Sequence, residues 1–300
     1  TRSLVGSEMC IRDSVMTADP VRSGAGEIAA HTPATALGTA PARGMLAGRR
    51  LLVVGGGQQT YGQGDPPVGI GRAISILAAR EGAAVAVADV DRGAAGDTVA
   101  RILTDGGSAH AIAGDAADSE QADQLLARAA DLLGGLDALA LNTGIAAGVG
   151  LSGTSPADWD RVLAVNLRAH FLALRAALPL LEPGSAIALT SSTAARAVTT
   201  TDSPAYTASK AALDGLCAYA AKEYAPRRVR VNVVMPGLID TSLGRLASVV
   251  RPERDTTPIP LGRQGTAWEV AEAAVFLLSD AASYITGTVL PVDGGLVSVR

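Results

Sequence analysis

The stretch LLVVGGGQQTYGQGDPPVGIGRAISILAAR, residues 51–80, joins a short apolar run to a glycine-rich loop and then to an amphipathic segment of helical length. An apolar run bounded by glycines predicts a buried strand. Glycines ahead of a helix let backbone N–H groups approach a phosphate closely, and the helix start adds partial positive charge. The stretch therefore predicts a strand, a phosphate-binding turn and a helix, in that order.

The same alternation of strand and helix continues to the end of the chain. Seven apolar runs are predicted as strands: 51–55, 83–89, 108–114, 136–142, 185–191, 229–235 and 287–293. Six segments between them are long enough for crossover helices: 69–81, 92–104, 119–133, 156–181, 204–224 and 267–279. Strands that are buried on both faces read as continuous apolar runs. We therefore expect an α/β fold with a doubly wound, parallel, seven-stranded sheet of Rossmann type, in a single domain over residues 46–300.

Residues 1–45 lack this periodicity, and from Thr17 to Gly44 they are rich in Ala, Gly, Pro, Thr and Ser. We expect a disordered leader here. The run SLVGSEMCIRDS (3–14) resembles a translated adaptor sequence, so part of the leader is expected to be non-native, with Met16 as the start. A transit peptide is the alternative, although acidic residues in the segment count against it.

The composition excludes several classes of partner. The chain has 25 basic and 29 acidic residues, a formal charge of −4, and only 3% aromatic residues, so we expect no nucleic-acid partner. Its two cysteines and three histidines share no ligand spacing, so neither a disulfide framework nor a metal site is expected. No apolar run reaches the roughly 18 residues that span a bilayer. We therefore expect a cytoplasmic protein without membrane contact.

The second predicted strand ends in an acidic residue that bears on the choice of cofactor. Asp89 lies 18 positions after Gly71, where a carboxylate can accept both ribose hydroxyls of an adenosine and would repel a 2′-phosphate. This favours NAD over NADP, and Arg92 nearby moderates the preference. A solvated acid at a strand end is the alternative.

The most specific signal is the pair Tyr206 and Lys210. Residues four apart lie on one face of a helix, and a lysine ammonium beside a phenol favours the phenolate that a general base needs. A surface pair without chemistry is the alternative. Ser192 follows the strand 185–191 and could hold a substrate oxygen, although Ser191 and Thr193 are equal candidates from spacing alone.

Taken together, these residues resemble the short-chain dehydrogenase/reductase family over residues 49–300. Leu141-Asn142-Thr143-Gly144 is similar to the family's motif after the fourth strand, and Pro236-Gly237 to its nicotinamide segment. The resemblance assigns catalysis to Asn166, Ser192, Tyr206 and Lys210. It assigns cofactor binding to Gly56, Gly57, Gly69, Ile70, Gly71, Asp89, Asp115, Ala116, Asn142, Gly144, Tyr206, Lys210, Pro236, Gly237, Ile239 and Thr241.

The resemblance implies hydride transfer between NAD(P) and a secondary alcohol or ketone, without a metal. Tyr206 would exchange the proton, Ser192 would orient the substrate oxygen, Lys210 would lower the tyrosine pKa and bind the ribose, and Asn166 would hold a water. The matching helices imply a homotetramer. Two alternatives stay open: an NADPH-dependent 3-oxoacyl thioester reductase, which Asp89 counts against, and a dinucleotide-sensing relative without catalysis.

Two regions depart from the family or resist interpretation. Gly56 and Gly69 are 13 positions apart, which leaves nine additional residues in the glycine motif. That insertion could cover the adenosine phosphates, reach a neighbouring subunit or lie in solvent. Residues 238–263 are expected to form a lid, and the apolar residues around the predicted pocket favour a neutral substrate. Arg196 or Arg245 could receive a carboxylate, although solvated arginines are the more common case.

Overall fold

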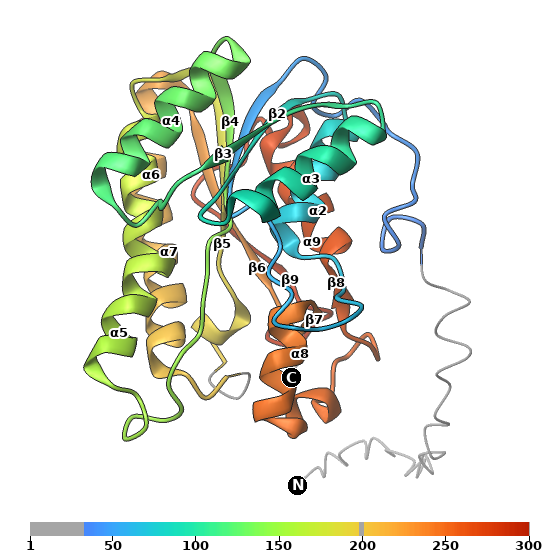
Figure 1. The fold of residues 1–300 in the computed structure, drawn as a ribbon, viewed down its shortest axis with the longest axis vertical. Coiled ribbons are helices and arrows are strands. Elements are labelled where there is room, and N and C mark those ends of the chain that lie inside the picture. The colour runs from blue at the N-terminus through green and yellow to red at the C-terminus, as the bar shows by residue number, and fades with distance from the viewer. Residues whose placement is uncertain (1–32, 198–200, 300) are drawn as a thin grey trace, which may run out of the picture. The chain divides into compact units, whose positions relative to one another are not determined.

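A computed structural model of the protein describes residues 33–197 and 201–299. In this part of the chain a parallel sheet has the strand order β3-β2-β1-β4-β5-β6-β9 (Figure 1). Its strands are β1 (Arg50–Val54), β2 (Ala84–Asp89), β3 (Ser108–Ala113), β4 (Leu136–Leu141), β5 (Leu181–Thr190), β6 (Arg230–Pro236) and β9 (Val289–Val292). The predicted seven-stranded, doubly wound fold is confirmed.

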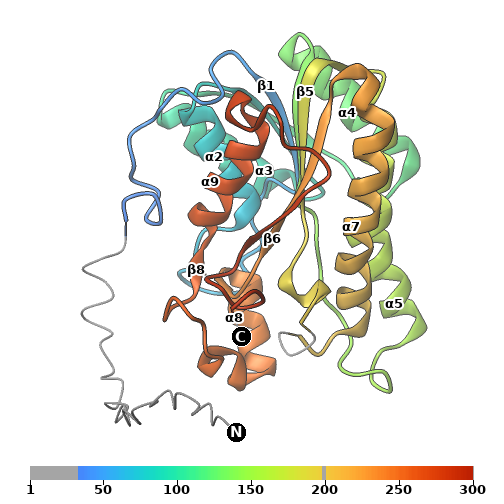
Figure 2. The same cartoon turned by 180° about the vertical axis from the view of Figure 1, so that it is seen from behind.

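Helices cover both faces of the sheet, as Figures 1 and 2 show from opposite sides. One layer contains α2 (Ile70–Arg80), α3 (Arg92–Thr104) and α9 (Ala267–Leu278). The other contains α4 (Ser119–Leu133), α5 (Pro156–Leu163), α6 (Ala169–Ala177) and α7 (Pro204–Tyr224). Successive side chains of β1 alternate between the layers: Leu51 and Val53 pack with the first layer, Leu52 and Val54 with the second. All four are buried, which explains the continuous apolar run.

The prediction of one continuous helix over 156–181 is wrong, because a turn of another type interrupts it and it ends earlier. A π-helical turn, Ala164–Arg168, separates α5 from α6, and α6 ends at Ala177. Pro179 cannot continue a helix because it has no N–H to donate and its ring clashes with the preceding turn. Strand β5 then begins at Leu181, four residues earlier than expected.

The N-terminal boundary also differs from the expectation. Residues 1–32 of the predicted leader lie outside the described residues, but 33–45 pack against the domain. The Ala36 side chain is buried, and its carbonyl accepts a hydrogen bond of 2.7 Å from Thr266. Gly38 has φ +67°, and a Cβ there would lie 2.3 Å from the Trp268 ring, so this close contact requires glycine. Disorder up to residue 45 was therefore the wrong expectation for 33–45.

The segment between β6 and α9 folds into a small unit of its own. It contains β7 (Ile239–Asp240), α8 (Ser242–Val250), a 3₁₀ turn (Pro252–Thr256) and β8 (Gly265–Thr266), and β7 pairs with β8 in a second, two-stranded sheet. This unit lies beyond the carboxyl ends of the strands (Figure 1). None of the helices in the described part of the chain is long and apolar enough to cross a membrane.

Candidate active site

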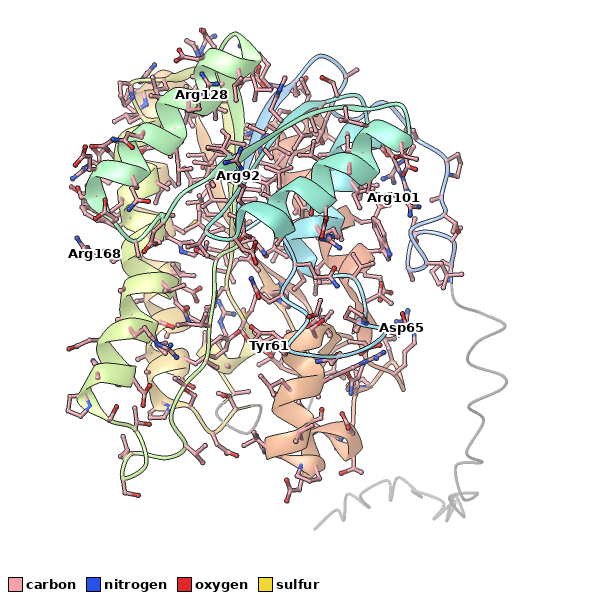
Figure 3. The ribbon with its side chains drawn as sticks, in the orientation of Figure 1. Tyr61, Asp65, Arg92, Arg101, Arg128 and Arg168 are labelled. Carbon is pink, nitrogen blue, oxygen red and sulfur yellow. The ribbon has the colours of Figure 1, made fainter. Side chains whose placement is uncertain are left out.

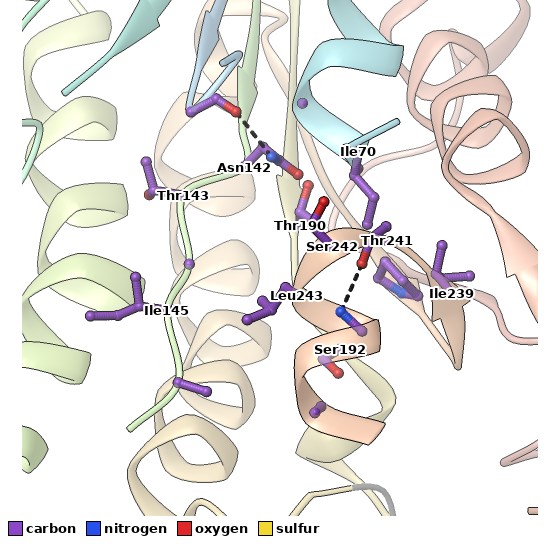
Figure 4. A pocket seen from close by; sticks show the side chains of 18 of the residues that line it. Ile70, Asn142, Thr143, Ile145, Thr190, Ser192, Ile239, Thr241, Ser242 and Leu243 are labelled. Atoms are coloured by element: carbon purple, nitrogen blue, oxygen red, sulfur yellow. Dashed lines mark hydrogen bonds between the residues drawn. The ribbon is translucent and has the colours of Figure 1, made fainter. Parts of the chain in front are cut away.

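A pocket of about 350 Å³ opens where the carboxyl ends of the central strands face α8 (Figure 4). Ligands of open parallel sheets bind at this edge. Fourteen of the predicted site residues line it: Gly57, Gly69, Ile70, Gly71, Asp89, Asn142, Gly144, Ser192, Tyr206, Lys210, Pro236, Gly237, Ile239 and Thr241. The pocket is therefore the place where the sequence-based assignments converge.

Four predicted residues do not line this pocket. Gly56 packs against Val87, where a Cβ would lie 2.8 Å from a side-chain carbon. Asp115 uses its carboxylate to accept a hydrogen bond of 2.8 Å from the Ala117 N–H, and Ala116 is buried in the core. Asn166 is fully buried behind the pocket wall. The roles that the resemblance gives these four residues therefore stay predictions.

Helix α7 positions Tyr206 and Lys210 through its first turn. Ser203 is the N-cap, where its hydroxyl accepts from the Tyr206 N–H and donates to Ala147 O at 2.6 Å. Pro204 occupies the first helical position, where a missing N–H has no cost. The cap therefore fixes where α7 begins and places Tyr206 at the pocket wall.

The Tyr206 phenol responds to three neighbouring influences. Burial raises its pKa above the ordinary value, whereas a hydrogen bond with Ser192 and the positive charge of Arg254 lower it. The effect of Lys210 on the tyrosine pKa stays a prediction, and Arg254 is a second cation that acts on the phenol.

Lys210 lies deep in the protein, with its ammonium 5.8 Å from the centre of the Tyr206 ring. It donates to Thr190 O, at the end of β5, at 2.9 Å, and to Thr143 O, in the loop after β4, at 3.4 Å. Burial lowers its pKa to about 7. A buried lysine of this kind holds two strand ends together and leaves one donor for a ligand.

The three hydroxyls that spacing alone left open have different partners. Ser191 donates to Lys210 O at 2.9 Å and is buried, and Thr193 is also buried. Ser192 is half-buried, adopts an extended backbone and lines the pocket, and its hydroxyl lowers the pKa of the Tyr206 phenol. Ser192 is therefore the candidate that the structure favours.

Both amide N–H groups and the oxygen of the Asn166 side chain have hydrogen-bond partners. Its oxygen accepts from the Ile145 N–H at 2.8 Å, and its amide donates to Ile145 O at 2.9 Å and to Ser209 at 3.0 Å. It lies in the π-helical turn, a feature common near functional sites. The side chain ties the π turn and α7 to the loop after β4, and its role in holding a water stays a prediction.

The cofactor end of the pocket is built for close backbone approach. A Cβ on Gly71 would lie 1.9 Å from Gly55 O, which the Asn142 amide also contacts at 3.1 Å (Figure 4). Ser242, at the start of α8, has a buried hydroxyl that finds no partner among the described residues, and it lines the pocket. Closely packed glycines let the backbone approach a dinucleotide phosphate, and a hydroxyl without a partner at a helix start can donate a hydrogen bond to it.

The inserted loop 57–69 reaches across the pocket toward α8. Gln58, Gln59 and Tyr61 line the pocket, and Gln63 donates to Ser242 O at 2.9 Å. Figure 3 labels Tyr61 and Asp65 on this loop, beside α8. The loop therefore lines the pocket and contacts α8 of the same chain, and its role toward a cofactor stays a prediction.

Arg254 is a pocket residue that the sequence did not reveal. It lies in the 3₁₀ turn after α8 and lines the pocket although its side chain is only 8% exposed. Arg196 and Arg245, the arginines considered for a substrate carboxylate, instead pair with Asp214 and Asp240 and do not line the pocket. No periodicity marks a single buried residue in an irregular lid, so only the three-dimensional packing could identify it.

The fold and this pocket define a class of protein: Rossmann-type proteins that bind a dinucleotide at the carboxyl edge of a parallel sheet. A family model described as Enoyl-(Acyl carrier protein) reductase matches residues 67–297. The chain belongs to the short-chain dehydrogenase/reductase family.

Individual relatives extend over most of the chain. 2-(S)-hydroxypropyl-CoM dehydrogenase 3 of Xanthobacter autotrophicus is 37% identical over 77% of this chain and 93% of its own. Cis-4-hydroxycyclohexanecarboxylate dehydrogenase of Sinomonas cyclohexanicum is 40% identical over 77% and 93%. The solved short-chain dehydrogenase/reductase of Serratia marcescens has a TM-score of 0.76 at 33% identity, covering 85% of this chain and 100% of that one. The protein is thus an NAD(P)-dependent oxidoreductase of secondary alcohols or ketones.

Proposed function

We propose that the protein is an NAD-dependent dehydrogenase of secondary alcohols, in which Tyr206 exchanges the proton of the substrate oxygen. The observation that carries this proposal is the Tyr206 phenol at the wall of a pocket that Ser192 also lines, with two cations, Lys210 and Arg254, lining the same pocket. The names of the similar relatives, which describe dehydrogenases of hydroxylated compounds, support the substrate class.

The chain's own residues would divide the work between proton transfer and orientation. A bound nicotinamide would supply the hydride acceptor or donor. In oxidation, the Tyr206 oxygen takes the hydroxyl proton while Ser192 donates a hydrogen bond that fixes the substrate oxygen. Lys210 keeps the ends of β4 and β5 in register with the tyrosine. Asn166 acts as a positioning residue through Ile145 and Ser209.

The preference for NAD rests on Asp89. Its carboxylate lines the pocket at the end of β2 and accepts from the N–H groups of Gly57 at 2.9 Å and Asp91 at 3.1 Å. These backbone donors hold the carboxylate in place, and each oxygen keeps a lone pair for a ribose hydroxyl. A 2′-phosphate would meet this negative charge directly. The geometry therefore supports NAD over NADP.

We also propose a homotetramer that assembles through the layer of α5, α6 and α7. Trp159, Phe171 and Tyr219, one on each of these helices, expose aromatic surface. Exposed apolar surface gathered on one layer of helices is characteristic of subunit interfaces.

The Tyr206→Phe variant tests the proposed chemistry. We expect kcat for secondary alcohols to fall by a factor of about 10² or more, because the proton acceptor is lost. NADH binding, followed by nicotinamide fluorescence, should change little. Tyr219→Phe is the matched control because Tyr219 is an exposed tyrosine on the same helix. Full turnover in Tyr206→Phe would show that another group exchanges the proton.

A further inference from the structure

Arg254 places a positive charge inside the wall of the substrate pocket. Its side chain is 8% exposed, and it follows α8 in the lid segment. Moving a guanidinium out of water has a large free-energy cost unless a negative group compensates it. The partners of Arg254 therefore show whether its charge is already neutralised.

The direct hydrogen-bond partners of Arg254 are all neutral. Its Nη1 donates to Ser248 at 3.2 Å and to Gln264 at 3.3 Å, and its Nη2 donates to Ile239 O at 3.2 Å. Its Nε has no acceptor among the described residues. The carboxylate of Asp255 lies 3.7 Å away, is 57% exposed and accepts from Ser248 at 2.7 Å. The buried charge thus has one loose, solvated ion pair.

Two other arginines of this region, Arg245 and Arg196, form closer ion pairs than Arg254 does. Arg245 forms a two-pronged pair with Asp240, with N···O distances of 2.8 and 2.9 Å. Arg196 pairs with Asp214 at 3.3 Å. Both side chains are about half exposed and neither lines the pocket. Arg254 combines burial, a weak ion pair and a place in the pocket wall.

The surrounding backbone makes room for this guanidinium at the reacting end of the pocket. A Cβ on Gly244 would lie 2.9 Å from the Arg254 Nη2, so the absence of a side chain there allows the close approach. The charge of Arg254 also reaches Tyr206, where it lowers the phenol pKa. The guanidinium therefore sits near the proposed proton acceptor and is held by neutral partners that leave its charge available.

We infer that the substrate carries an anionic group, a carboxylate, which Arg254 binds while the carbinol oxygen lies at Tyr206 and Ser192. This inference rests on the proposed function. It replaces the expectation of a neutral substrate, which followed from the apolar residues around the pocket. A carboxylate would accept a charge-assisted hydrogen bond from Nε and would complete the charge balance that Asp255 leaves open.

Hydroxy acids and their methyl esters form matched pairs for the test. We would compare kcat/KM for 3-hydroxybutanoate, 4-hydroxypentanoate and 5-hydroxyhexanoate with kcat/KM for each ester, with NAD saturating. The variants are Arg254→Met, Arg254→Lys and, as a matched control, Arg196→Met. We expect the wild type to prefer an acid, and the acid-to-ester ratio to fall by about 30-fold or more in Arg254→Met. Arg254→Lys should lie between them, and Arg196→Met should keep the wild-type ratio.

Binding to the wild-type protein saturated with NADH gives a second readout that does not need turnover or a variant that folds. Hexanoate should quench or enhance the NADH fluorescence at a lower concentration than methyl hexanoate, and Arg254→Lys should weaken this preference. An acid-to-ester ratio of kcat/KM that is equal in wild type and Arg254→Met would overturn the inference, as would equal binding of hexanoate and its ester. Turnover of the esters would still support the proposed function in that case. Arg254-dependent hexanoate binding without turnover of any acid or ester would instead support the anion site and count against the proposed dehydrogenase.

Discussion

Lys210 carries its ammonium group inside the protein, where two backbone carbonyls are its hydrogen-bond acceptors. Burial lowers its pKa from 10.5 to about 7, so the folded state binds a proton here less tightly than the unfolded chain does. Below pH 7 both states carry the charge and the cost of burying it is complete. As the pH rises from 7 toward 10.5, the folded state has released its proton and the cost declines.

This increase of stability with pH leads to a prediction for Lys210→Met, which keeps the length of the side chain and removes the titrating group. The stability of the wild type relative to this variant should increase by about 3 kcal/mol between pH 7 and pH 9.5. Urea unfolding of both proteins at several pH values measures the difference, and other titrating groups cancel in it. A difference that stays constant with pH would show that Lys210 keeps an ordinary pKa.

Asp89 is the residue on which the proposed cofactor preference depends. Asp89→Ala removes the carboxylate and its repulsion of a 2′-phosphate, so the ratio of kcat/KM for NAD to that for NADP should fall by about 10-fold or more. Asp97→Ala is a suitable control because Asp97 lies on the following helix and does not line the pocket. An unchanged ratio in Asp89→Ala would place the source of the preference elsewhere.

Among the structural elements, the inserted loop 57–69 sets the glycine motif of this chain apart from the shorter motif of the family. Gln63 fastens the loop to α8 through Ser242 O, and Arg245 adds a weaker contact of 3.4 Å to Asp65 O. The loop and α8 thus both line the pocket and contact each other there. We expect this connection to slow the release of a bound dinucleotide.

Weakening the connection should accelerate release of the cofactor. Gln63→Ala removes one hydrogen bond of about 1 kcal/mol, so we expect the NADH dissociation rate to rise by about 3- to 10-fold. Stopped-flow fluorescence measures that rate directly. Gln124→Ala, on the exposed surface of α4, should leave it unchanged. If Gln63→Ala releases NADH at the wild-type rate, the loop does not close the site.

Elements also differ in how far sequence could predict them. The strands were predictable because both of their faces are buried, and α7 because Ser203 and Pro204 mark its start. The π turn around Asn166 has no comparable signal, since its helical composition matches that of its neighbours. The burial of Ala36 and Arg254 comes from contacts with distant segments, which no local pattern records. Sequence therefore predicted a lid over 238–263 and the residues that meet in the pocket, but not which lid residue lies in the pocket wall.

At the scale of the whole molecule, the two helical layers differ in the apolar surface that they present to solvent. Phe171 on α6 is 49% exposed and Tyr219 on α7 is 68% exposed, and Trp159 on α5 adds to the same layer. In the other layer, Leu103 at the end of α3 is the comparable exposed residue, at 54%. Aromatic side chains contribute more to subunit association than aliphatic ones of similar exposure.

The proposed tetramer makes Phe171→Asp the informative substitution. A charge at this position would be buried without a partner in the interface, so we expect the variant to dissociate into smaller species while its circular dichroism spectrum stays native. Light scattering coupled to size-exclusion chromatography should give the mass of four chains for the wild type and for Leu103→Asp, and a lower mass for Phe171→Asp. A four-chain mass in all three proteins would move the interface away from the α5, α6 and α7 layer. A single-chain mass for the wild type would refute the tetramer itself.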